Sequence, residues 1–265
     1  MAEIVFLGTA AALRLPSFHC TCSTCESARS GAIPERTRAS IGILGDQTTI
    51  IDSGPDIAEQ LEREGIRRID NVLLTHWHYD HIGGLTEFGE PGSCEGWDLI
   101  PVFTPQSGID HFNSELQYLK RRFAPHLVEP NKPFEIGSTR IVPVKSQHTE
   151  DSLGFILTGN RTVAYMGDGI RPPDETMDRL KGIDVLIIEA SLDELDEADW
   201  LCQDIASAVE IWKEVACPEC ILTHMSFHRW RGGNLIAGFT EEERHAVLEQ
   251  HPGLRMAEDG LRIPF

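Results

Sequence analysis

The stretch Val72-Leu-Leu-Thr-His76-Trp-His78-Tyr-Asp80-His81-Ile-Gly-Gly84 decides how this chain of 265 residues is interpreted. Its first residues form a short apolar run, which predicts a buried β-strand that ends at Thr75. Side chains able to bind a metal follow the strand within six positions. They are His76, His78, Asp80 and His81.

The spacing of these four residues predicts two metal positions rather than one. His76 and His78 alternate on extended chain, so both imidazoles can face the same point. Asp80 and His81 are adjacent, so their side chains diverge and can reach a second point nearby. Two ions about 3.5–4 Å apart are the natural geometry for such a pair of points.

At this point the chain resembles the metallo-β-lactamase-fold hydrolases, whose signature is His-x-His-x-Asp-His directly after a strand. The resemblance covers nearly the whole chain. Such enzymes take three further ligands from the ends of later strands, and each has a candidate here. These are His148 in Ser146-Gln-His148-Thr, Asp168 in Tyr-Met-Gly-Asp168-Gly and His224 in Ile-Leu-Thr-His224.

The resemblance implies how seven residues share two divalent ions. His76, His78 and His148 would hold one ion, Asp80, His81 and His224 the other, and Asp168 would bridge the two. Asp80 and Asp168 are the predicted catalytic residues. Imidazole and carboxylate ligands suit Zn, Mn and Fe alike. Asp52, in Ile50-Ile-Asp52-Ser-Gly, matches an early aspartate of the family that supports the histidine loop. A turn or helix-cap aspartate before Pro55 is the alternative.

Three of the seven cysteines crowd into Cys20-Thr-Cys22-Ser-Thr-Cys25. In a reducing compartment such clustering predicts metal or redox chemistry before disulfides. A Cys-x-Cys-x₂-Cys run soon after the first strand resembles the phosphoribosyl 1,2-cyclic phosphate phosphodiesterases. It is also similar to the pyrroloquinoline quinone biosynthesis protein B group. Both resemblances imply one structural zinc, held by the three thiolates and, in the phosphodiesterases, by a histidine for which His228 is the candidate.

Two alternatives to this zinc site stay open. His19 competes with His228 for the fourth position, although a residue adjacent to Cys20 would be strained in the same tetrahedron. Three buried thiols without a metal are the other possibility. Cys217 and Cys220 are interpreted as buried small apolar side chains rather than as ligands.

Strands and helices alternate along the chain and predict an α/β protein. Tight turns such as Gly45-Asp46 join strands that should pair antiparallel, and strands separated by a helix need parallel crossovers. The predicted strands are Ile4–Leu7, Ser40–Leu44, Thr48–Asp52, Val72–Thr75, Leu99–Phe103, Thr139–Val144, Gly154–Leu157, Thr162–Met166, Val185–Glu189 and Cys220–Thr223. The predicted helices are Asp56–Glu64, Ser107–Arg122, Pro173–Lys181, Ile205–Val215 and Thr240–Gln250.

The resemblance refines this pattern to a four-layer αββα sandwich, in which two mixed β-sheets are flanked by helices. We expect a single domain over residues 1–265, with a Cys-rich zinc loop at 19–25 that has no regular structure. The Gly-rich stretch Gly89–Gly96 and the acidic stretch Asp193–Asp199 are expected to be surface insertions.

Composition limits the classes of partner. Lys and Arg number 23 against 42 Asp and Glu, which gives a formal net charge of −19. Such a charge argues against nucleic acid as the main partner, because affinity for nucleic acid depends on neutralising phosphates. Apolar runs are too short for a membrane span, and the first residues lack the basic start of a signal peptide. We therefore expect a cytoplasmic protein. The resemblance to the cyclic phosphodiesterases implies a small phosphorylated substrate, and a homodimer is left open.

The predicted function is a dinuclear-metal hydrolase, a phosphodiesterase that attacks a small (cyclic) phosphodiester with a metal-bridging hydroxide. The cyclic phosphodiesterases protonate the leaving group with a histidine placed before the helix at Ile205. This chain has Trp200-Leu-Cys202-Gln-Asp204 there, so the donor is not assigned. One alternative is a cofactor-biosynthesis protein resembling the quinone group, acting as an oxidoreductase or carrier. Another is a tRNA 3′-processing nuclease, against which stand the net charge and the short acidic segment Phe88–Asp98.

Overall fold

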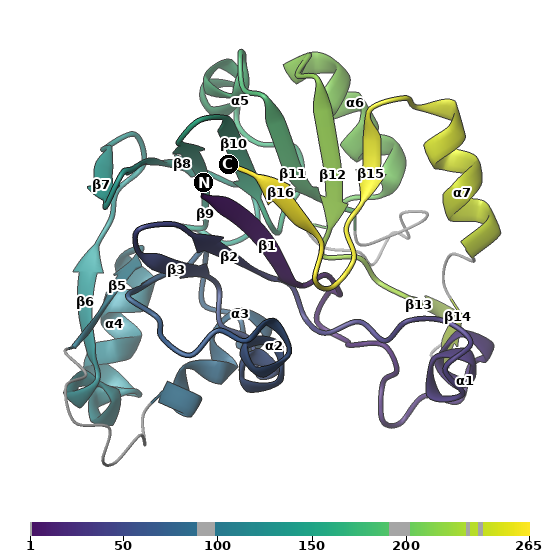
Figure 1. Ribbon diagram of the computed structural model, residues 1–265, viewed down its shortest axis with the longest axis horizontal. Helices are drawn as coiled ribbons and strands as arrows, with labels where there is room; N and C mark the ends of the chain where they lie inside the picture. Colours follow the sequence, from purple (N-terminus) through teal and green to yellow (C-terminus); the bar gives the residue numbers. More distant parts are fainter. Residues whose placement is uncertain (1, 89–98, 191–201, 232–233, 238–240) are drawn as a thin grey trace.

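The computed structural model describes residues 2–88, 99–190, 202–231, 234–237 and 241–265, and within 229–245 only the backbone is described. Two β-sheets lie face to face at the centre of the molecule, and helices cover their outer sides (Figure 1). The stretches Gly89–Gly96 and Asp193–Asp199, expected to be insertions, lie outside the described residues. Among the helices that the structure describes, none has the length and apolar character needed to span a membrane.

The first sheet joins an antiparallel part to a parallel part. The strands from β16 to β3 pair antiparallel with their neighbours, whereas the strands from β3 to β6 run parallel. The strand order is β16 (Arg262–Pro264), β1 (Glu3–Gly8), β2 (Ser40–Leu44), β3 (Thr48–Ile51), β4 (Asn71–Leu73), β5 (Ile100–Thr104) and β6 (Phe123–Leu127).

The second sheet is also mixed. The strands from β7 to β10 form an antiparallel meander, and the strands from β10 to β15 run parallel. The strand order is β15 (Leu254–Met256), β12 (Glu219–Thr223), β11 (Val185–Glu189), β10 (Thr162–Met166), β9 (Leu153–Thr158), β8 (Thr139–Lys145) and β7 (Phe134–Ile136). A separate hairpin consists of β13 (His228–Arg231) and β14 (Asn234–Ala237).

Apolar side chains on both faces of the strands explain the layered arrangement. In β1, Ile4 and Phe6 belong to a buried cluster between the two sheets, while Val5 and Leu7 pack against the helices outside. Side chains alternate across a strand, so a strand that is apolar at every position must be covered on both faces. The four-layer αββα sandwich predicted from the sequence is confirmed.

Helices pack on the outer face of each sheet. The first sheet is covered by α2 (Ile57–Glu64), α3 (Tyr79–Ile82), the 3₁₀ helix η1 (Gly83–Phe88), α4 (Gln106–Ser114) and the 3₁₀ helix η2 (Gln117–Arg121). The cluster on the second sheet receives side chains from α1 (Ser23–Arg29), α5 (Asp174–Leu180), α6 (Ile205–Val215) and α7 (Glu241–Gln250). Cys217 and Cys220 are both buried in this cluster, as predicted.

Two local predictions are wrong. The single helix expected over Ser107–Arg122 is divided into α4 and η2, with the break at Glu115–Leu116. Short polar side chains end α4, because the Ser114 hydroxyl donates to the Asp110 carbonyl and competes with the helical backbone. The loop expected over residues 19–25 has no regular structure only as far as Cys22, since helix α1 begins at Ser23.

Candidate metal centre

The ends of several strands meet at one edge of the sandwich. Strands β3 and β4 run parallel, as do β10, β11 and β12, and β8 points the same way because two antiparallel pairings separate it from β10. The carboxyl ends of parallel strands lie at the same edge of a sheet. The residues that follow these ends therefore come together, although they are far apart in the sequence.

A first group of metal-competent atoms contains His76, His78, His148 and Asp168, and these atoms lie within 4.8 Å of one another. The Nδ1 atom of His78 lies 2.9 Å from the Nε2 atom of His76 and 3.0 Å from that of His148. The carboxylate of Asp168 is 3.2 Å from His148 Nε2 and 3.6 Å from His76 Nε2. Converging imidazole nitrogens of this kind are typical of a metal site.

A second group contains Asp80, His81, His224 and again Asp168. The Oδ2 atom of Asp80 lies 3.3 Å from His81 Nε2 and 3.4 Å from His224 Nε2. The Oδ2 atom of Asp168 lies 3.5 Å from His81 Nε2 and 3.7 Å from His224 Nε2. The structure therefore brings together all seven residues predicted from the sequence, and Asp168 belongs to both groups.

The residues fit the ions that the resemblance implies. Two buried atoms at the centre, His81 Nε2 and Asp168 Oδ1, have no hydrogen-bond partner among the described residues. A buried polar atom without a partner is costly, and coordination to a cation would remove that cost. The histidine and aspartate clusters thus suit a metal site of mixed imidazole and carboxylate donors.

Burial and opposite charges shift the pKa values of these groups in different directions. Burial lowers the pKa of His76 well below its ordinary value, and the neighbouring His81 lowers it further. Burial alone would lower the pKa of His224, but Asp168, Asp80 and Glu189 outweigh burial and raise it to about 10. The buried carboxylates thus favour the protonated form of His224, whereas burial favours the neutral form of His76. Metal binding would displace the proton of His224.

Polar contacts behind the cluster orient its histidines. Asp52 is fully buried, and its carboxylate accepts from the backbone N–H and the hydroxyl of Thr75, both at 2.8 Å. It also lies 2.8 Å from Nδ1 of His81, so a proton on Nδ1 leaves the Nε2 lone pair facing the centre. The Thr75 hydroxyl lies 3.0 Å from Nδ1 of His76 and has the same effect there.

We expect Asp52→Asn to weaken metal binding without unfolding the protein. The amide can still accept from Thr75 but presents an N–H to His81, which favours the tautomer with its proton on the metal side. Loss of such a supporting carboxylate lowers metal affinity or activity by roughly 10- to 100-fold. Competition with a chromogenic chelator measures the affinity. Asp184→Asn is the matched control, because its carboxylate also accepts a backbone N–H, from Thr162, and lies outside the metal cluster. Equal loss in both variants would contradict an orienting role for Asp52.

Glu189 belongs to the same region and was not singled out from the sequence. It ends strand β11, is fully buried, and accepts a hydrogen bond from the backbone N–H of Gly169. Its other oxygen is 3.6 Å from Nδ1 of His224. Burial and the nearby Asp168 raise the pKa of Glu189 to about 8. A charged residue that ends a wholly apolar strand is the signal that could have identified it.

The cysteine cluster forms a separate group with one histidine. Cys20, Cys22, Cys25 and His228 place their ligand atoms within 4.8 Å of one another, and Cys25 Sγ is 3.0 Å from His228 Nε2. His19 is exposed and contacts Ser17 instead. The four side chains suit a tetrahedral metal site of the Cys₃His type. Figure 1 shows α1, which carries Cys25, beside the hairpin that begins at His228.

The profile of the β-lactamase superfamily domain matches residues 47–225, which is more than half of the chain. The chain belongs to the β-lactamase superfamily. Within this superfamily, it is similar to a diphosphatase from the PhnP family, with a TM-score of 0.84 and 25% identity over 100% of this chain and 98% of the other. The zinc-bound PqqB of Methylobacterium extorquens has the same fold, with a TM-score of 0.83 and 18% identity over 99% and 100% of the two chains.

Two curated relatives carry other activities in their names. An octanoyltransferase of Porphyromonas gingivalis is 28% identical over 84% of this chain, which spans 46% of that protein's length. A ribonuclease Z of Methanopyrus kandleri is 25% identical over 88% of this chain and 94% of its own. The superfamily therefore places several reactions on the fold that this chain shares, and the choice among them depends on the site.

Proposed function

We propose that this protein is a dinuclear metal-dependent phosphodiesterase that acts on a small, including cyclic, phosphodiester. The observation that carries the proposal is the pair of donor groups that share Asp168. His76, His78 and His148 would hold one divalent ion, Asp80, His81 and His224 would hold the other, and Asp168 would serve as a ligand in both groups. Zn, Mn and Fe all suit these donors.

When bound, two such ions supply Lewis acidity for the phosphoryl oxygens and lower the pKa of a coordinated water to near neutrality. The residues of the chain orient the ligands and limit the access of water. Asp52 and Thr75 hold His81 and His76 with their donor nitrogens toward the centre, and Glu189 lies behind His224 in the same way. Burial of His76, His81 and His224 keeps bulk water away from the inner side of the site.

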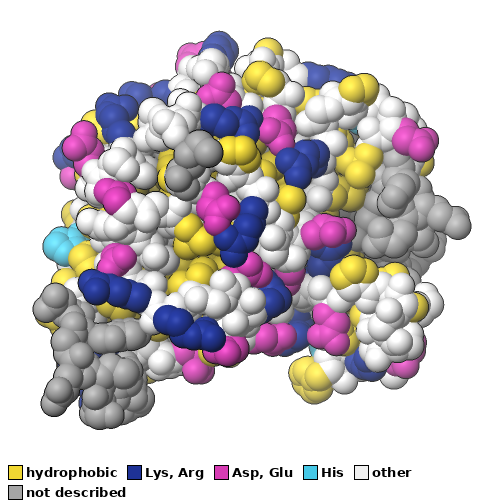
Figure 2. Space-filling view, in the orientation of Figure 1, with side chains coloured by type: hydrophobic (Ala, Val, Ile, Leu, Met, Phe, Trp, Pro, Cys, Tyr) yellow, Lys and Arg dark blue, Asp and Glu magenta, His cyan; other side chains and the backbone are white. Residues whose placement is uncertain are grey.

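Among the donors that the structure describes, the most exposed one marks the side at which a substrate can reach the cluster. His78 is exposed and His148 is partly exposed, whereas most of the other donors are buried. A phosphodiester would therefore approach past His78. Acidic and basic side chains are interspersed on the face shown in Figure 2. The formal net charge of −19 supports a small substrate rather than a nucleic acid.

Hydrolysis of bis-p-nitrophenyl phosphate tests the proposal. The protein is stripped with a chelator, reloaded with Mn, Zn or Fe, and assayed at a measured metal content. We expect turnover to vanish on stripping and to return with at least one metal, and the diester to be preferred over p-nitrophenyl phosphate. A protein shown to hold two ions that hydrolyses no diester with any of the three metals would contradict the proposal.

The similarity to ribonuclease Z makes RNA the necessary comparison substrate. Ribonuclease and small-diester hydrolysis share the bond that breaks, so the metal site alone does not separate them. The same preparation is offered a precursor tRNA with a 3′ trailer. Preferential cleavage of that RNA would replace the small substrate by the nuclease alternative.

A further inference from the structure

A cavity of about 780 Å³ opens directly beside the candidate metal centre. It lies between helix α4 and the ends of strands β6 and β8, and the segment after His148 forms another wall. His78 lines the cavity and is also the exposed member of the first donor group. A phosphodiester bound at the centre would therefore extend one of its two organic arms into this cavity.

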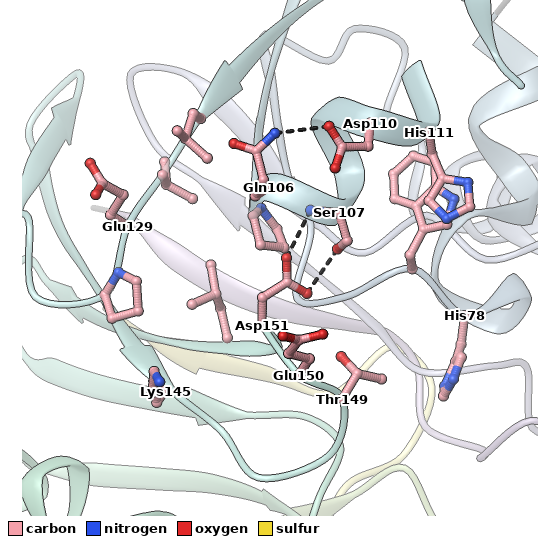
Figure 3. Close-up of a pocket in the computed structure, with 16 residues that line it drawn as sticks. His78, Gln106, Ser107, Asp110, His111, Glu129, Lys145, Thr149, Glu150 and Asp151 are labelled. Carbon is pink, nitrogen blue, oxygen red and sulfur yellow. Dashed lines mark hydrogen bonds between the residues drawn. The ribbon is translucent and has the colours of Figure 1, made fainter. Parts of the chain in front are cut away.

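The walls of the cavity are acidic. Asp110, Glu129, Glu150 and Asp151 line it, and Lys145 is the one lysine or arginine among the described lining residues. Glu129 is paired with Lys132, which lies next to this wall. Figure 3 shows Asp151, Glu150 and Thr149 grouped between Lys145 and His78. These four carboxylates make the cavity unfavourable for a second phosphate and favourable for a cation.

The acidic groups differ in how freely they can meet an occupant. The carboxylate of Asp151 accepts from the backbone N–H of Ser107 at 2.7 Å and from its hydroxyl at 2.8 Å, which fixes this wall to the start of α4 (Figure 3). Asp110 accepts from the Gln106 amide at 2.9 Å. Glu150 is exposed and forms no ion pair or hydrogen bond with the residues that the structure describes. Its charge is available to a ligand.

Apolar and aromatic surface accompanies the charge. Trp77 lines the cavity next to His78, and its ring stacks on His111 with centroids 4.7 Å apart and planes 16° from parallel. Leu127 and Val128 add aliphatic surface. Carboxylates together with an indole and aliphatic side chains suit an ammonium group that carries carbon substituents, through charge and cation–π attraction.

We infer that the cavity holds the organic arm of the diester and that this arm is cationic, as in a phosphodiester of an amino alcohol. The inference rests on the proposed function for the position of the phosphate. What the inference adds is that the cavity prefers a cationic arm to a neutral one. This preference can be measured with or without turnover.

Two substrates that differ only in one charge test it. p-Nitrophenyl phosphorylcholine and p-nitrophenyl 3,3-dimethylbutyl phosphate have the same shape, but carbon replaces the quaternary nitrogen in the second. We expect kcat/KM to be about tenfold higher for the cationic substrate, the range of a partly desolvated cation–π and charge interaction. Equal values, or a preference for the neutral arm, would overturn the inference while leaving the phosphodiesterase proposal intact.

Variants locate the selectivity. Glu150→Gln should lower the ratio of the two kcat/KM values by about threefold, as expected for one exposed charge, with little change for the neutral substrate. The double variant Glu150→Gln with Asp110→Asn should bring the ratio close to 1. Glu249→Gln is the matched control, because it removes an exposed carboxylate from α7, which Figure 1 shows on the opposite side of the molecule from α4. An unchanged ratio in the double variant would contradict the assignment of this cavity.

A binding measurement distinguishes failure of the phosphodiesterase proposal from failure of the inference that the cavity binds a cationic arm. Isothermal titration of the metal-loaded protein with phosphocholine and with 3,3-dimethylbutyl phosphate reports on the cavity even when no diester is cleaved. Absence of turnover together with tighter binding of phosphocholine would reject the phosphodiesterase proposal and support a cavity that selects a cationic group. Equal affinities would reject the cavity assignment whatever the turnover.

Discussion

Asp168→Ala is expected to abolish phosphodiester hydrolysis and to release at least one of the two metal ions. Asp168 is buried and lies within 3.2–3.7 Å of four histidine nitrogens, two in each donor group. Alanine removes an oxygen donor from both groups and the carboxylate charge that balances the two cations. Loss of such electrostatic stabilisation lowers kcat by roughly a thousandfold or more.

Metal content and turnover are measured on the same preparation, by elemental analysis and by the bis-p-nitrophenyl phosphate assay. Far-ultraviolet circular dichroism establishes that the variant is folded. Asp178→Ala is the control, because Asp178 is an exposed aspartate on α5 that pairs with Lys181. If the Asp168 variant kept two ions and normal turnover, Asp168 would not bridge the site.

The fold and the donor groups were accessible from the sequence because each donor follows a short apolar strand. The local pattern around His76, Asp168 and His224 indicates where each strand ends, and the resemblance to the metallo-β-lactamase-fold hydrolases implies that these ends share an edge. The strands β10, β11 and β12 appear with boundaries within one residue of those predicted. Central strands with two covered faces leave little ambiguity in their pattern.

Other features depend on contacts that the local pattern does not contain. Strands β15 and β16 have three residues each and are defined by pairing with β12 and β1. Glu189 belongs to the site because β11 lies between β10 and β12, which carry Asp168 and His224. The cavity beside His78 forms where α4 lies against the segment after His148, a contact between parts of the chain that are distant in sequence. Such non-local effects override local propensity.

Cys22→Ser is expected to release one tightly bound zinc and to destabilise the protein, while the ions at the His76–His224 centre stay bound. Cys20, Cys25 and His228 are buried around a common point with Cys22, and Cys22 precedes the first residue of α1. A closed shell of four ligands would leave no position for water, so a zinc ion bound there would have a structural role. It would tie α1 to the β13–β14 hairpin, which follows His224 by only a few residues.

The expected loss of stability in Cys22→Ser follows from the coupling of metal binding to folding. Zinc bound only by the folded protein adds its binding free energy to the free energy of unfolding. A loss of about 3–4 kcal/mol corresponds to a Tm lower by about 10 °C in a domain of this size. Differential scanning calorimetry gives the Tm, and elemental analysis after dialysis against a weak chelator gives the zinc content.

Cys217→Ser is the matched control, because Cys217 is buried away from this cluster and its thiol donates to the Glu219 carbonyl, a bond that serine can keep. A wild-type protein without a tightly held zinc beyond the active-site pair would reject the site. Equal destabilisation by both serine variants, without zinc release, would show that Cys22 acts through packing alone.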